Sequence, residues 1–287
     1  MDAMRPEGRK HDQLLSRRDP GTPSSGHRAE RFLTMRVSPK PSTALIVFML
    51  YLVLFYGVWV VTDVDYENIG ESADTLMKWY FAPTWVGGIA MAIAVWWLGW
   101  WRPVMFERER SGARWLMIAP AFTAILLILF AITSDFSGLN GAMVLFLLLG
   151  SAGVGFAEEI TTRGILITGF RPTMTEPAVW FFSCLLFGLL HLPNWFFGLG
   201  AASVPQVLLA FGVGSTFYLL RRFSGTLVLC MVLHAAWDFV AFAGERPGSL
   251  AALVVVNALV GLVFGLVYVR SARGQRVGQS DESEVAA

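Results

Sequence analysis

Charged side chains are scarce along this 287-residue chain, where Asp, Glu, Lys and Arg make up 15% and apolar residues 55%. About a quarter of the residues of a soluble domain are charged, so the composition excludes an ordinary water-soluble globule. The net charge is only +1, and the basic residues lie beside apolar segments, not in an aromatic-interleaved patch. Nucleic-acid binding is therefore not expected.

Cysteine is nearly absent, and internal repeats are absent. The two cysteines, Cys184 and Cys230, lie within apolar runs, where small buried side chains are expected. They predict neither a disulfide framework nor a cysteine metal site, and no cofactor is expected. The missing repeat argues against a transporter assembled from inverted halves.

Long apolar segments are abundant. A helix of about 20 apolar residues crosses a bilayer. Eight segments reach or approach that length, and their ends are predicted to within a few residues. They predict an all-α polytopic transmembrane helix bundle, with the lipid bilayer as its partner. The predicted spans are 44–62, 79–101, 115–134, 142–160, 178–199, 203–220, 224–243 and 250–269. The fourth is expected to continue as a helix past Arg163.

The basic residues predict the orientation of these spans. Nine Lys and Arg residues precede the first span, and further Arg residues follow the second, sixth and eighth. The alternate loops hold almost none, and the loop after the first span is acidic. Because positive charge is retained in the cytoplasm, both termini are expected inside, which requires an even number of spans. The compact form favours a bacterial inner-membrane protein.

The chain divides into four regions on these grounds. Residues 1–43 are polar without an apolar period and are expected to be a disordered cytoplasmic tail, as are residues 271–287. Residues 44–141 hold three spans without His, Asp or Glu in their apolar stretches, and are expected to form a scaffold. The catalytic helices are expected within residues 142–270.

Five ionisable side chains interrupt the apolar runs, and all lie on the fourth, fifth and seventh spans. They are Glu158, Glu159, His191, His234 and Asp238. Charged groups in hydrocarbon are costly, so such a set is a functional-site hypothesis by default. Helices of a bundle can converge on one polar cavity. Two carboxylates and two imidazoles around a cavity are the parts of a hydrolytic site, with a base for water and donors for an oxyanion.

The carboxylates also allow a structural interpretation. Glu159 and Arg163 are four residues apart on one helical face, so they can form an ion pair that caps a helix end. Glu158 lies about 100° around the helix and is free to face elsewhere. Arg163 stabilises the negative charge of its partner, Glu159, while burial opposes ionisation of the other carboxylate, Glu158. Such different environments for two carboxylates are typical of acid–base pairs.

The histidines have structural alternatives as well. A lone His191 on an apolar helix is more often a packed core residue than a catalyst. Asp238 follows His234 by one helical turn, so it can fix the tautomer of that imidazole. The same pair could instead be an interhelical hydrogen bond.

In this order, Glu158-Glu159-x-x-x-Arg163, Phe187-x-x-x-His191 and His234-x-x-x-Asp238 resemble the three motifs of the CPBP family. These are CAAX-processing and bacteriocin-processing membrane proteases, also called Abi proteins, whose eukaryotic relatives are the type II CAAX prenyl endopeptidases. The resemblance covers residues 142–243. It implies a glutamate-dependent intramembrane endopeptidase without a metal, acting on a protein or peptide that is prenylated or unprenylated.

The resemblance also implies roles for the motif residues. Glu158 with His191 would activate water, and Glu159 with Arg163 would support the first carboxylate. His234 and residue 238 would stabilise the oxyanion. The family often has Asn at the last position. Because Asp238 donates a hydrogen bond only when protonated, it is expected to orient His234, which alone would face the oxyanion.

Two points stay open on the sequence alone. The same side chains could bind zinc in a metalloprotease, although the His-Glu-x-x-His arrangement is missing, or form the proton relay of a transporter. A non-catalytic chaperone or scaffold is the third alternative.

At about 1.5 Å per residue, the predicted spans separate Glu158 and His191 in depth by over about 10 Å. Tilted or shifted helices are needed to close that gap, with a site at or just cytoplasmic of the midplane.

Overall fold

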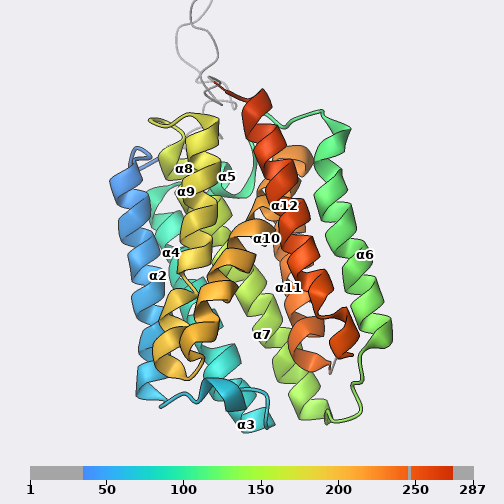
Figure 1. The fold of residues 1–287 in the computed structure, drawn as a ribbon. Helices are drawn as coiled ribbons and strands as arrows, with labels where there is room; N and C mark the ends of the chain where they lie inside the picture. Colours follow the sequence, from blue (N-terminus) through green and yellow to red (C-terminus); the bar gives the residue numbers. More distant parts are fainter. Residues whose placement is uncertain (1–34, 245–246, 274–287) are drawn as a thin grey trace, which may run out of the picture. The chain divides into compact units, whose positions relative to one another are not determined.

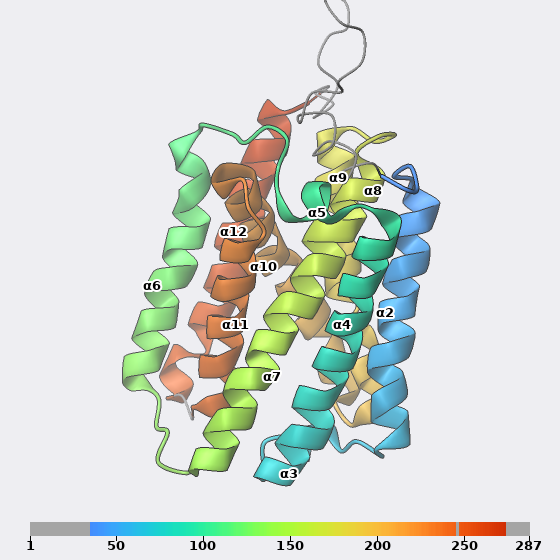
Figure 2. The ribbon, with the colours of Figure 1, turned by 180° about the vertical axis from the view of Figure 1, so that it is seen from behind.

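A computed structural model of the chain describes residues 35–244 and 247–273. Within these ranges there is no strand, and the bundle is built from helices alone, which confirms the all-α prediction (Figures 1 and 2). The α-helices are α2 (Pro41–Val61), α3 (Ala73–Thr75), α4 (Ala82–Leu98), α5 (Trp101–Met105), α6 (Ile118–Thr133), α7 (Gly141–Glu159), α8 (Ile167–Phe170), α9 (Glu176–Leu189), α10 (Ser203–Ser224), α11 (Val228–Ala243) and α12 (Ala252–Ser271). The predicted tails fall largely outside the described residues, although Pro41 to Thr43 begin α2.

Among the described residues, seven helical stretches are long and apolar enough to cross a membrane. They are Pro41–Val61, Ala73–Leu98, Arg114–Thr133, Gly141–Phe170, Glu176–Phe197, Gly200–Ser224 and Gly248–Ser271. The span predicted at 224–243 is α11, which has only 16 residues. It is shorter than predicted because α10 continues to Ser224, through residues that the sequence assigned to a loop.

The described chain begins and ends at the same end of the bundle (Figures 1 and 2). Seven long stretches together with the shorter α11 make an even number of passes, as this arrangement requires. We call this the terminal end, and the end where α3 lies the distal end. The orientation of the two ends across a membrane stays a prediction.

The helix that carries the two glutamates continues well past them. α7 runs without a break into η5 (Ile160–Leu166), a π-helix, and then into α8, which confirms the predicted continuation past Arg163. π-helical turns are rare and are frequent at functional sites. In both views α7 lies between α2 at one edge of the bundle and α6 at the other (Figures 1 and 2).

The close approach of α7 and α11 depends on Gly155. A Cβ atom at this position would lie 2.5 Å from the carbonyl oxygen of Met231 and 2.9 Å from the amide nitrogen of Ala235. Only a residue without a side chain allows the two backbones to approach so closely. Since Gly155 lies one turn before the glutamates, this contact brings them beside His234, which lies between Met231 and Ala235 on α11.

Candidate active site

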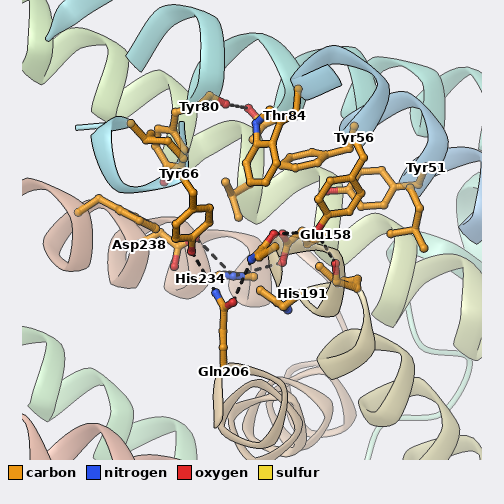
Figure 3. Close-up of a pocket in the computed structure, with 18 residues that line it drawn as sticks. Tyr51, Tyr56, Tyr66, Tyr80, Thr84, Glu158, His191, Gln206, His234 and Asp238 are labelled. Atoms are coloured by element: carbon orange, nitrogen blue, oxygen red, sulfur yellow. Dashed lines mark hydrogen bonds and ion pairs between the residues drawn. The ribbon is translucent and has the colours of Figure 1, made fainter. Parts of the chain in front are cut away.

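The three helices bring all six predicted site residues into one region, but not all of them face the cavity. Glu158, His191, His234 and Asp238 line a cavity of about 160 Å³ (Figure 3). Glu159 and Arg163 lie behind its wall, with side chains 0% and 1% exposed. The site therefore has a cavity-facing set and a fully buried supporting pair.

The buried pair is an ion pair extended by a histidine. Arg163 Nη1 lies 3.0 Å from Glu159 Oε1, the contact that the four-residue spacing predicts. The same oxygen accepts a hydrogen bond from His234 Nδ1 at 2.9 Å. The guanidinium also covers the ring of Phe187 at 3.7 Å, a cation–π contact. Both contacts are to one oxygen, Oε1, of a side chain that does not line the cavity, so Glu159 is ion-paired and out of reach of a water in the cavity.

Glu158 has the opposite environment. Its side chain faces the cavity, and Oε2 has no hydrogen-bond partner among the described residues. The nearest cationic group is His234, whose Nε2 lies 3.9 Å from that oxygen. Two adjacent carboxylates thus occupy different environments, one neutralised and one open to the cavity, which is how acid–base roles are separated in enzymes.

His191 lies just beyond a helix, not within one as the sequence suggested. α9 ends at Leu189, and His191 precedes the 3₁₀ helix η6 (Leu192–Phe197), which begins with Leu192 and Pro193. Its Nδ1 lies 3.0 Å from the carbonyl oxygen of Phe187. Because a carbonyl oxygen only accepts, Nδ1 carries the proton, and in the neutral ring Nε2 is left as an acceptor.

Asp238 differs from the expectation that it fixes the orientation of His234. Its Oδ2 lies 3.7 Å from His234 Nε2, which is ion-pair range but not a hydrogen bond. The hydrogen bond that orients the ring comes from Glu159 on the other nitrogen. The ring also stacks on Phe217, with centroids 4.9 Å apart. The i,i+4 spacing suggested the wrong carboxylate because a contact between helices takes precedence.

The depth discrepancy disappears once the helix ends are known. Glu158 lies 12 residues before Phe170 and His191 lies 15 residues after Glu176, and these two ends face the same short turn. At about 1.5 Å per residue the two side chains are about 18 and 22 Å from that turn. The predicted separation of over about 10 Å arose because the fourth span was ended ten residues too early.

The cavity also draws on residues that the sequence assigned to a scaffold. Aromatic and polar side chains of α2, α4 and their connection line it, including Tyr51, Tyr56, Trp59, Tyr66, Tyr80 and Thr84. A hydrogen-bonded chain crosses the wall: Tyr56 donates to Asn194 at 2.9 Å, Asn194 to Gln206 at 2.9 Å, and Gln206 to the Tyr66 hydroxyl at 3.4 Å. Only the polar character of these side chains within apolar segments could have indicated them.

A second buried set of charges, which we call the arginine cluster, closes the terminal end. It comprises Glu107, Arg171, Glu176, Arg221 and Arg222. Glu107 binds Arg171 at 2.8 Å and both Arg221 and Arg222 at 2.5 Å, with its side chain 0% exposed. Burial alone would raise the pKa of Glu107, but the three guanidinium groups lower it to about 2.

The arginine cluster directly contacts the helix that carries the two glutamates. Arg221 donates a hydrogen bond to the backbone carbonyl oxygen of Arg163, within η5, and another to that of Pro103 at 2.8 Å. The sequence placed Arg221 and Arg222 in a loop, whereas both are buried in the last turn of α10. Their partners lie more than forty residues away along the chain, so no local pattern could reveal them.

The segment that carries the site residues matches a known family. Residues 140–240, about a third of the chain, match the family model described as type II CAAX prenyl endopeptidase Rce1-like. This match supports the family that the three motifs resemble and, with the apolar helices, a multi-pass membrane protease. A comparison with curated proteins gave no match.

Proposed function

We propose that this chain, a membrane protein with a CAAX-protease segment at residues 140–240, hydrolyses a peptide bond with water activated by Glu158. The observation that carries the proposal is the contrast between the two glutamates. Glu159 is bound by Arg163 and His234 behind the cavity wall, while Glu158 lines the cavity and its Oε2 has no hydrogen-bond partner among the described residues. A general base needs such an open lone pair within reach of its water.

In the proposed first step, water binds between Glu158 and Nε2 of His191. Both atoms are acceptors, so each can take one proton of the water as a hydrogen bond. Glu158 then accepts a proton as the water oxygen attacks the carbonyl carbon of the substrate. The carbonyl oxygen gains the negative charge of the tetrahedral intermediate.

His234 is the proposed donor to that oxyanion. Its Nδ1 is bound to Glu159, so only Nε2 is available on the cavity side. Carboxylates of Glu158, Glu159 and Asp238 surround the ring within 3.9 Å and favour its doubly protonated form. In that form Nε2 donates to the oxyanion. Collapse of the intermediate breaks the C–N bond, and the proton held by Glu158 passes to the leaving amine.

Two other functions make different predictions. A zinc protease needs at least three ligands on one ion, and no such group of His, Cys, Asp or Glu is present in the described residues. A proton-coupled transporter would move protons across liposomes without cleaving peptides. Besides its carboxylates and imidazoles, the cavity is lined by aromatic, aliphatic and uncharged polar side chains, which favours a site that holds a substrate.

The test is hydrolysis of a quenched-fluorescent peptide library by purified protein in detergent, with farnesylated and unmodified members. Each reaction is run with and without a chelator. Cleavage that a chelator does not change, with fragments confirmed by mass spectrometry, is the expected result. Loss of cleavage that zinc restores would replace the glutamate mechanism with the metal one, and proton flux without cleavage would indicate the transporter.

A further inference from the structure

The cavity lies entirely on the distal side of the catalytic groups. On α2 it is lined from Tyr51 onward to Trp59, and the lining continues to Tyr66 and Ile69 in the distal connection. On α11 it is lined from His234 onward to Phe242, toward the distal end of that helix. The parts of α2 before Tyr51 and of α11 before His234 contribute no lining residue, so the cavity extends from the site toward the distal end.

The terminal side of the site is closed by buried charges and packed side chains. Glu107 and Arg221 are both buried there and bound to each other. Arg221 also donates to the backbone carbonyl oxygens of Arg163 and of Pro103, so the cluster is bound to the helix that carries the glutamates. Around these contacts Ile165, Leu166 and Leu227 are 0% exposed. A substrate entering from this end would have to break a buried ion-pair network.

The two ends also differ in charge. In the described residues, Lys78 is the only basic side chain at the distal end, and it binds Asp74 at 2.6 Å. Exposed acidic side chains surround the distal connection instead: Asp63, Asp65, Glu67, Glu71 and Asp74. Apart from Arg163 at the site, the described arginines lie at the terminal end. Since Lys and Arg are retained in the cytoplasm, the distal end faces away from it.

We infer that the active site takes its substrate from the extracytoplasmic side, and that the peptide segment it cleaves is neutral or basic. This inference rests on the proposed function. It also changes the side from which the substrate is expected to enter, because the sequence predicted a site toward the cytoplasm. The substrate class is then an exported or membrane-anchored polypeptide whose scissile bond lies beyond the cytoplasm. The acidic rim favours approach of basic segments by long-range attraction, which salt screens.

The test compares right-side-out and inverted membrane vesicles that contain the protein. Both receive a quenched-fluorescent peptide that cannot cross the bilayer, before and after permeabilisation with detergent. Right-side-out vesicles are expected to show most of their total activity without detergent, and inverted vesicles almost none. Cleavage by intact inverted vesicles alone would overturn the inference.

Matched cysteine variants establish the orientation in the same vesicles. Gly70→Cys at the distal end and Gly112→Cys at the terminal end both replace exposed glycines with open space around them. The native cysteines are buried, so background labelling is low. An impermeant maleimide is expected to label Gly70→Cys from outside and Gly112→Cys only in inverted vesicles. The reverse pattern would overturn the inference even if the peptide is cleaved.

Substrate charge provides the last readout. A lysine-flanked peptide is expected to have a several-fold higher kcat/KM than a glutamate-flanked peptide of the same sequence, with the difference shrinking at high salt. An equal or reversed preference would contradict the role of the acidic rim. Permeabilised wild-type vesicles without any activity would instead overturn the proposed function, so the two failures are distinguishable.

Discussion

Replacing Glu107 by Gln should destabilise the protein at neutral pH but not in acid. The carboxylate is fully buried and binds three arginines, and these contacts lower its pKa from the usual 4.5 to about 2. At about 1.4 kcal/mol per pH unit, the charged form contributes about 3 kcal/mol to the free energy of unfolding. Removing one partner of a buried ion pair typically costs about 3–5 kcal/mol, which is a comparable amount.

The sign of the pH dependence follows from the lowered pKa. Because the folded state binds the proton more weakly than the unfolded state, the stabilisation is fully present above about pH 4.5. It is lost progressively as the pH falls toward about 2, and only below that pH is Glu107 mostly protonated in both states. The stability of wild type should therefore converge on that of Glu107→Gln in acid.

Thermal unfolding in lipid nanodiscs, from about pH 7 to pH 3, measures this difference. The control is Glu109→Gln, which removes an exposed carboxylate from the same loop and leaves its backbone contact with Arg222 in place. Glu107→Gln should melt well below both proteins at pH 7 and approach them at pH 3. Equal melting temperatures at pH 7, or a difference that does not change with pH, would refute the reasoning.

Two further predictions concern the packing and charge behind the site. Gly155→Ala should destabilise the bundle by about 1–3 kcal/mol because its methyl group meets the backbone of α11. The control, Gly57→Ala, has open space around it in α2 and should be neutral or stabilising by up to about 1 kcal/mol. Thermal unfolding of the two variants distinguishes a specific contact from a general intolerance of alanine. Arg163→Gln should abolish cleavage and lower stability by about 3–5 kcal/mol, since Glu159 loses its buried cation, and an active, stable variant would show that the pair is dispensable.

The site residues could be predicted from the sequence because ionisable groups are conspicuous in apolar segments. Glu158, His191 and His234 line one cavity although they come from α7, the turn after α9, and α11. The partner of His234 could not be predicted. Helical spacing pointed to Asp238, while the closest carboxylate is Glu159 on another helix, where the approach at Gly155 brings it.

The surroundings of the site were beyond sequence reasoning for a physical reason. Glu107 reaches its arginines across more than sixty residues of chain, and Tyr66 reaches Gln206 across 140. Such contacts depend on tertiary packing, which local periodicity does not describe. The continuation of α7 through η5 and the extension of α10 to Ser224 shifted the predicted ends of the spans.

The most direct test of the central claim is the turnover of Glu158→Gln on a peptide that wild type cleaves. Gln keeps the size of the side chain but has no lone pair basic enough to accept the proton of water. Loss of a general base typically lowers the rate by about 10²–10⁴-fold, and we expect at least that loss in kcat with unchanged thermal unfolding. A Glu158→Gln protein that cleaves the peptide at the wild-type rate would contradict the account.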